Sequence, residues 1–131
     1  MTTGFYHFQD DARNAGIQID INGQLFHRDR AMVSVFDSGF VLGDGIWEGL
    51  RVFNGRVAFF DEHMDRLFEG AKALDFELDL SRAQLSERID RLLAANGMHD
   101  GVSIRLMVSR GVKSTPNQDP RVTIGGPTIV I

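Results

Sequence analysis

The chain has 131 residues, enough for one domain of ordinary size with a hydrophobic core. Hydrophobic residues make up 43% of it and charged residues 24%, proportions that belong to a globular protein and exclude a disordered tail. The formal charge of -4, with no basic patch, argues against a nucleic-acid-binding protein. No apolar run approaches the ~20 residues that a membrane-spanning helix needs.

The N-terminal sequence, the absence of cysteine and the spacing of the histidines bear on cell compartment, disulfide bonding and metal binding. The N-terminus lacks the basic start and apolar stretch of a secretory signal, so we expect a cytoplasmic protein by default. There is no cysteine, which excludes a disulfide scaffold and a thiol nucleophile. The histidines lie far apart with no i,i+4 pair, so no metal site is expected; they are His7, His27, His63 and His99.

The first half of the chain predicts two β-hairpins. Residues 1–16 are polar with scattered aromatic side chains and no period, which indicates an N-terminal arm. Isoleucines at 17, 19 and 21 then alternate with polar residues, and apolar residues return after Asn22-Gly23. The same arrangement recurs on both sides of Asn54-Gly55. Asn-Gly tolerates the positive φ that both central positions of a type I′ turn require, so an antiparallel sheet is expected.

Two helices are predicted after the second hairpin. The first is capped by Asp61 and carries apolar side chains at helical spacing over residues 64–74. The second opens on a capping box formed by Ser81 and Gln84. It ends at Asn96-Gly97, where glycine suits the left-handed cap position.

The last third of the chain predicts a further strand and an exposed loop. Residues 102–109 alternate strictly between apolar and polar, as a strand with one buried face does. A polar loop follows from Val112 to Pro120, and the β-branched run 128–131 stops without a terminator. We favour a chain that continues past Ile131; the alternative is a C-terminal strand paired in the centre of the sheet. The elements together predict an α+β fold, a mainly antiparallel sheet with two helices packed on one face.

The densest chemical signal lies in residues 34–51, SVFDSGFVLGDGIWEGLR, where four glycines fall within eleven residues. Such glycines indicate positive φ or close approach of the backbone to a bulky group, although a tight helix-to-strand connection explains them equally well. The segment is neither a Walker A loop nor a dinucleotide fingerprint, because the residues around it do not match either motif. Asp37 and Asp44 are interpreted as turn-capping residues rather than a catalytic carboxylate pair.

Three motifs, in order, resemble those of the class IV aminotransferases: DSGFVLGDGIWEGLR, FDEHMDRL and SIRLMVSRG. This family of fold-type-IV pyridoxal-phosphate enzymes includes branched-chain and D-amino acid aminotransferases, (R)-selective amine transaminases and aminodeoxychorismate lyases. The resemblance implies a two-domain homodimer that transfers an amino group between an amino acid or amine and a 2-keto acid. Its cofactor is pyridoxal 5'-phosphate. The chain matches only the N-terminal part: an arm at 1–16, the small domain at 17–120, and the start of a connection to a missing larger domain at 121–131.

The resemblance assigns roles to five residues. Arg66 matches the arginine that binds the cofactor phosphate, and a guanidinium suits this role because it grips phosphate bidentately and keeps its proton. Trp47 and Gly49 match positions that line the substrate pocket, and they share a strand face with Arg51. Arg105 matches an arginine facing the same cavity. Two arginines in one cavity suggest that the substrate carries a carboxylate.

The residues alone leave simpler interpretations open. Without the resemblance, the residues favour a solvated helix position for Arg66, with His63 as its neighbour one turn earlier. Arg51 suits a structural ion pair with Glu48 or Asp44.

Two departures from subfamily patterns bear on the substrate. The run GVKSTPNQDPR contains no histidine, whereas D-amino acid aminotransferases carry an Arg-x-His carboxylate trap there, so that specificity is disfavoured. Leu42 stands where several members have a pocket tyrosine, so the pattern is not a plain branched-chain match either. In the family the loop that corresponds to GVKSTPNQDPR closes over the active site, often the active site of the partner subunit.

The resemblance places the Schiff-base lysine in the second domain, so no catalytic residue is expected in this chain, which is predicted to be inactive alone. Its two lysines, Lys72 and Lys113, are both expected to be solvated. Two other functions stay open: a lyase of the aminodeoxychorismate kind with the same cofactor, and a non-catalytic stand-alone domain that dimerises.

Overall fold

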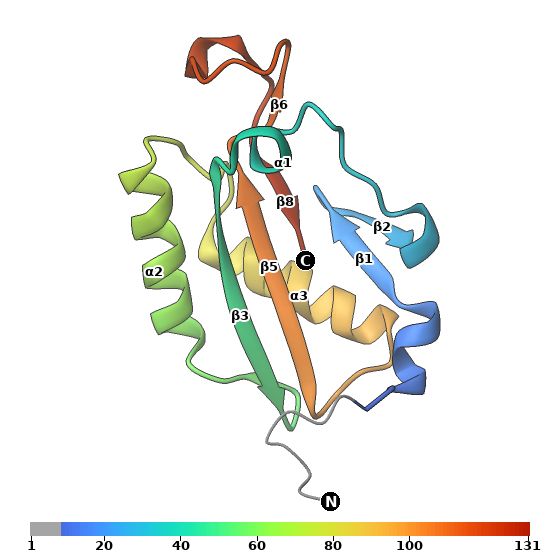
Figure 1. Ribbon diagram of the computed structural model, residues 1–131. Helices are drawn as coiled ribbons and strands as arrows, with labels where there is room; N and C mark the ends of the chain where they lie inside the picture. The colour runs from blue at the N-terminus through green and yellow to red at the C-terminus, as the bar shows by residue number, and fades with distance from the viewer. Residues whose placement is uncertain (1–8) are drawn as a thin grey trace, which may run out of the picture.

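The computed structural model describes residues 9–131; the aromatic residues expected to anchor the arm, at positions 5, 6 and 8, lie outside the described residues. A six-stranded sheet forms the centre, with the order β2-β1-β8-β5-β3-β4 and antiparallel pairing throughout (Figure 1). Its strands are β1 (Gln18–Ile21), β2 (Gln24–His27), β3 (Gly45–Phe53), β4 (Arg56–Val57), β5 (Val102–Ser109) and β8 (Thr128–Val130). The helices are α1 (Ser38–Leu42), α2 (Phe60–Ala73) and α3 (Arg82–Ala95), with 3-10 turns at Ala12–Gly16, Arg28–Arg30 and Pro120–Val122.

Both predicted hairpins are confirmed. Asn22 and Gly23 have φ of 51° and 88°, and Asn54 and Gly55 have φ of 49° and 75°, so both turns place two consecutive residues at positive φ. β1 pairs with β2 across the first turn and β3 pairs with β4 across the second. The two longer helices, α2 and α3, cover one face of the sheet and leave the other face open (Figure 1), which confirms the α+β fold.

The predicted caps are confirmed for α3 but not for α2. The capping box at Ser81 and Gln84 is present at the start of α3, and Gly97 adopts a φ of 59° beyond its end. The cap predicted at Asp61 is wrong, because α2 begins at Phe60 and the preceding residue makes no side-chain cap. Asp61 lies in the first turn instead, where a negative charge interacts favourably with the helix dipole.

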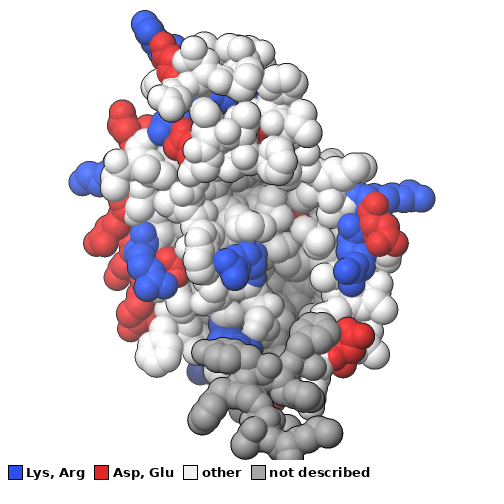
Figure 2. Space-filling model, viewed as in Figure 1, with Lys and Arg blue, Asp and Glu red and all other residues white. Residues whose placement is uncertain are grey.

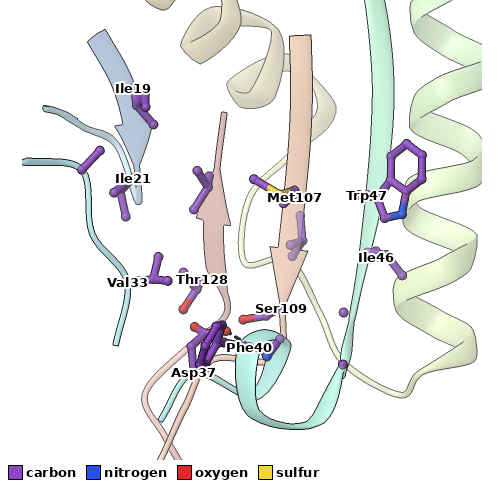
Figure 3. A pocket seen from close by; sticks show the side chains of 16 residues that line it. Ile19, Ile21, Val33, Asp37, Phe40, Ile46, Trp47, Met107, Ser109 and Thr128 are labelled. Carbon is purple, nitrogen blue, oxygen red and sulfur yellow. Dashed lines mark hydrogen bonds between the residues drawn. The ribbon is translucent and has the colours of Figure 1, made fainter. Parts of the chain in front are cut away.

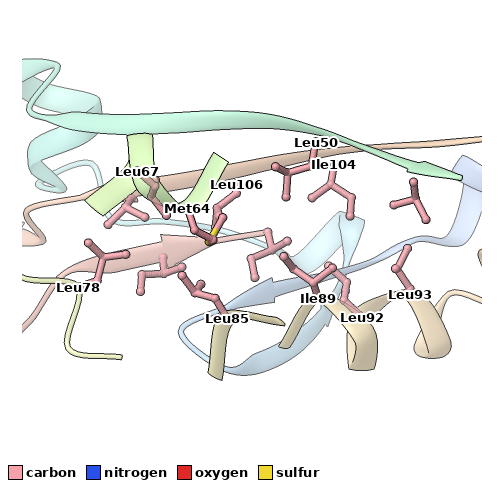
Figure 4. Close-up of a cluster of buried hydrophobic side chains, with 14 of the residues drawn as sticks. Leu50, Met64, Leu67, Leu78, Leu85, Ile89, Leu92, Leu93, Ile104 and Leu106 are labelled. Carbon is pink, nitrogen blue, oxygen red and sulfur yellow. The ribbon is translucent and has the colours of Figure 1, made fainter. Parts of the chain in front are cut away.

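The hydrophobic core lies between the sheet and the two longer helices. Leu50 of β3 and Ile104 and Leu106 of β5 point toward Met64 of α2 and Ile89 of α3 (Figure 4). The alternation predicted for residues 102–109 is confirmed as far as residue 108, since positions 102, 104, 106 and 108 are buried whereas 103, 105 and 107 are exposed; position 109, predicted on the polar face, is buried. In β5 the polar side chains at positions 103 and 105 therefore lie on the open face.

The C-terminal run is paired inside the sheet, as the alternative interpretation expected. β8 lies between β1 and β5, with Val130 opposite Ile21 on one side and Met107 on the other. Ile129 is 2% exposed, so the run contributes to the core. Where the small domain ends along the chain stays a prediction.

Residues 112–124 form a small excursion beyond the main sheet (Figure 1). It is a two-stranded hairpin of β6 (Val112–Lys113) and β7 (Thr123–Ile124). The expectation that Lys113 is solvated is wrong: the residue is 1% exposed, and its Nζ donates a hydrogen bond to the Asp119 carbonyl oxygen at 3.0 Å. The polar loop covers this side chain because it folds back over β6. Over residues 9–131, no helix has the length and apolar character required to cross a membrane.

Candidate functional site

Strand β3 organises the candidate site because its side chains alternate between two environments. Trp47, Gly49 and Arg51 face the open side of the sheet, whereas Glu48 and the residues at 50 and 52 face the helices. The register places Gly49 opposite Arg105 of the neighbouring strand β5. The four residues predicted to shape the substrate pocket therefore lie together on one surface.

Arg105 is held in place on this surface. Its guanidinium carbon lies 4.0 Å from the centroid of the Trp47 ring, which is a cation–π contact. Gly49 has no side chain to obstruct this contact, and a Cβ there would already touch the indole at 3.7 Å.

The alternative of a structural ion pair for Arg51 is contradicted. Glu48 is engaged by Arg66 and His63, and Asp44 is engaged by Arg110 at 2.7 Å. Within the described part of the chain, Arg51 pairs with neither of these carboxylates, so its charge is available on the open face.

A hollow of about 490 Å³ lies on the open face, and of the predicted pocket residues Trp47 lines it. Its walls are mostly apolar and come from β1, β3, β5, β8, α1 and the segment before α1; they include Ile19, Ile21, Val33, Phe40, Trp47 and Met107 (Figure 3). Figure 2 shows the same face as largely uncharged, with isolated basic side chains near its centre and acidic ones gathered over α2. An apolar hollow beside basic groups suits an organic anion with an apolar body.

Asp37 and Asp44 have separate structural tasks near this hollow. Asp37 caps α1, with its Oδ1 accepting a hydrogen bond from the Gly39 backbone at 2.9 Å, which confirms the capping interpretation. Asp44 instead forms the ion pair with Arg110, and Arg110 also donates to the carbonyl oxygen of Asp75 just beyond α2. This arginine therefore ties the glycine-rich segment to the end of that helix.

Arg66 lies on the helix-covered side of β3 and is not brought onto the surface of Trp47 and Arg105. Its Nε and Nη2 donate to the two carboxylate oxygens of Glu48 at 2.7 and 2.6 Å. The Arg66 side chain is nevertheless 71% exposed. β3 pairs with β4 only at residues 52 and 53, so within the described chain no strand covers its outer edge beside Arg66, between residues 45 and 50. A ligand lying across this edge can contact both surfaces.

Glu48 is the buried residue of this region whose contacts with Arg66 and His63 the sequence did not indicate. It is 2% exposed, and His63 Nδ1 lies 2.7 Å from its Oε2. Hydrogen bonding by Arg66 lowers the pKa of Glu48 more than burial raises it, and the same carboxylate raises the pKa of Arg66. An acidic residue at an inward-facing strand position was the available signal, because such a position requires a charged partner.

The chain offers limited means to hold a cofactor or a metal. Among residues 9–131, no cluster of three or more histidine, cysteine, aspartate or glutamate side chains has metal-site geometry. Lys72 is exposed on α2, as predicted, and Lys113 is enclosed by the loop. The exposed, firmly held guanidinium of Arg66 fits a phosphate group.

Sequence and structure comparisons identify the class of protein. Residues 45–124 match the model of the amino-transferase class IV family, and the chain belongs to that family. It is 41% identical over 118 residues to branched-chain-amino-acid aminotransferase-like protein 1 of Arabidopsis thaliana, covering 90% of this chain but 21% of that protein.

Two solved structures share the fold. One is the T.th. branched-chain amino acid aminotransferase complexed with N-(5'-phosphopyridoxyl)-L-glutamate, with a TM-score of 0.75 and 23% identity over 88% of this chain and 39% of that one. The other is 4-amino-4-deoxychorismate lyase from Pseudomonas aeruginosa, with a TM-score of 0.61 and 30% identity over 86% of this chain and 37% of that one. The chain thus spans well under half the length of these relatives.

Proposed function

We propose that this chain is part of a pyridoxal-phosphate-dependent enzyme that transfers an amino group between an amino acid or amine and a 2-keto acid. The observation that carries the proposal is the family match over the segment holding Trp47, Arg66 and Arg105. A solved relative of the same fold is complexed with a phosphopyridoxyl amino acid, which supports pyridoxal 5'-phosphate as the cofactor.

Each of the five predicted residues has a chemical task in this proposal. Arg66 would hold the cofactor phosphate through its exposed guanidinium. Arg105, oriented by Trp47, and Arg51 would bind the substrate carboxylate, and Gly49 leaves room for the substrate beside them. The cofactor, when bound, supplies the electron sink for the amino transfer. The apolar hollow would receive the side chain of the substrate and limit access of water.

We further propose that the lysine that carries the cofactor lies outside these 131 residues, so the chain alone has no activity. The support is that Lys72 is exposed to solvent and that Lys113 is enclosed and already hydrogen-bonded. A Schiff-base lysine must be accessible to the cofactor and partly desolvated.

A cytoplasmic homodimer is the assembly that we propose, with the loop after Arg110 reaching the neighbouring site. Large apolar side chains stay exposed before and within α1, among them Met32 at 76% and Phe40 at 74%, and such a surface suits a protein interface. Light scattering of the full-length protein tests this; a fully active monomer would contradict it.

A lyase acting on aminodeoxychorismate is the second candidate, favoured by the 30% identity to a solved lyase. The two are separated by assaying the full-length protein with cofactor for glutamate formation from 2-oxoglutarate and for pyruvate release from aminodeoxychorismate. Amino transfer supports the first proposal, and pyruvate release supports the second. Failure of both, in a protein that dimerises without binding the cofactor, would leave the stand-alone dimerisation domain.

A further inference from the structure

The buried carboxylate of Glu48 is bonded to both Arg66 and His63. We propose that Glu48, supported by His63, is a positioning residue that fixes the Arg66 guanidinium with one bidentate edge turned outward for a phosphate. The inference rests on the proposed function, since it concerns the phosphate of the same cofactor. It adds two residues to the site, neither of which is expected to contact the cofactor.

The hydrogen bonds leave a specific part of the guanidinium available. Arginine has five N–H groups, one on Nε and two on each terminal nitrogen. Glu48 accepts from Nε at 2.7 Å and from Nη2 at 2.6 Å, which occupies the side edge of the fork. No described residue accepts a hydrogen bond from Nη1. Both N–H groups of Nη1 therefore remain. Nη2 also lies 3.5 Å from His63 Nδ1, and when Nδ1 carries its own proton the second N–H of Nη2 remains as well. Together these groups form an end-on fork that matches two phosphate oxygens.

The carboxylate that holds Arg66 is itself immobilised. Glu48 is 2% exposed on the inner face of β3, and its Oε2 also receives His63 Nδ1 at 2.7 Å. Because Arg66 lowers the pKa of Glu48, this carboxylate is ionised near neutral pH and can only accept, so we assign the proton of the contact to His63 Nδ1. α2 approaches β3 closely here, because Gly70 packs on Ile46 and an added Cβ would lie 3.2 Å from its methyl group. Glu48 is consequently confined between strand and helix.

Two opposing effects decide what Glu48 does for a bound phosphate. Its negative charge partly neutralises Arg66, which by itself weakens attraction for an anion. It also removes the rotamer freedom that a long, exposed arginine would otherwise lose on binding. The charge effect is damped because the Arg66 side chain is 71% exposed to water, whereas the orientation of the fork is not screened. We therefore expect orientation to dominate, so that removal of Glu48 weakens phosphate binding.

The test compares pyridoxamine 5'-phosphate with pyridoxamine in the full-length protein by equilibrium titration. We define the ratio as the dissociation constant of pyridoxamine divided by that of pyridoxamine 5'-phosphate. This ratio isolates the phosphate contact, because a general loss of structure weakens the binding of both ligands. Arg66→Gln should reduce the ratio by roughly 30-fold or more, and Glu48→Ala by about tenfold. Glu48→Ala should have no further effect in the Arg66→Gln background. Asp65→Asn is the matched control, since Asp65 precedes Arg66 in α2 but its carboxylate binds Arg82 of α3, and it should leave the ratio unchanged.

The outcomes separate the two proposals. If Arg66→Gln leaves the ratio unchanged, the assignment of Arg66 to the phosphate is wrong and the proposed site fails. If Arg66→Gln reduces the ratio but Glu48→Ala leaves it unchanged or raises it, Arg66 binds phosphate and the positioning role of Glu48 is refuted. Because His63 only supports Glu48, we expect His63→Ala to reduce the ratio by less than Glu48→Ala does, with thermal unfolding unaltered. A larger reduction of the ratio in His63→Ala than in Glu48→Ala would contradict the assignment of Glu48 as the positioning residue and His63 as its support.

Discussion

The guanidinium of Arg105 lies over the indole ring of Trp47, with its central carbon 4.0 Å from the ring centroid. The two residues come from neighbouring strands, and the glycine between them in the register leaves the contact open. The negative face of the indole stabilises the cation and fixes its direction, so in the proposed site the contact would orient Arg105 for a carboxylate before a ligand arrives.

Replacing Trp47 with alanine should therefore weaken binding of a carboxylate substrate to the full-length protein. A cation–π contact contributes roughly 0.5 to 2 kcal/mol, so we expect KM for the keto acid to rise by a factor of about 2 to 30. Trp47→Phe keeps an aromatic face and should retain most of the affinity. Equal KM values for the wild type and the alanine variant would show that the contact does not prepare the arginine.

Neither lysine of this chain should be selectively modified by the cofactor. We expect that pyridoxal phosphate and borohydride give no stoichiometric adduct at Lys72, which is exposed on α2. None is expected at Lys113, which is 1% exposed and bound to the Asp119 carbonyl. Peptide mapping of the reduced 131-residue chain checks this. One dominant labelled lysine together with turnover would require a different active site.

Lys113 should hold the loop of residues 114–122 closed. Lys113→Ala removes a buried side chain and the donor to the Asp119 carbonyl, so we expect a loss of about 1 to 3 kcal/mol in unfolding free energy. Faster hydrogen exchange should be confined to this loop. Lys72→Ala is the control and should change stability by less than about 0.5 kcal/mol, because Lys72 is exposed. Similar exchange in both variants would show that Lys113 does not fasten the loop.

Glu48 should contribute a stability that depends on pH with a defined sign. Its folded-state pKa is lowered, chiefly by hydrogen bonding from Arg66, so the folded protein favours the ionised form more than the unfolded chain does. The contribution is fully present above the unfolded pKa of about 4.3 and is lost as pH falls through the lower folded value. The difference in unfolding free energy between wild type and Glu48→Gln should shrink as pH is lowered from about 6 to 3. A difference that stays constant over this interval would refute the linkage.

Much of the local structure was determined by the sequence itself. The Asn22-Gly23 and Asn54-Gly55 turns, the capping box at Ser81 and the alternation over residues 102–108 were all predicted and are present. Each depends on backbone preferences and side-chain periods within a few residues, which a single sequence displays directly. The motif series likewise indicated the family, because its residues occur in a fixed order along the chain.

Only the tertiary structure decided which residues meet across elements. Glu48 binds Arg66, not Arg51, because alternation along β3 turns it toward α2. Lys113 is enclosed although its loop is polar, because the hairpin returns over it, and residues 128–130 occupy the sheet between β1 and β5. These contacts join segments far apart in the chain. Their energies come from burial and charge pairing that exist only after the elements have packed, so no local pattern contains them.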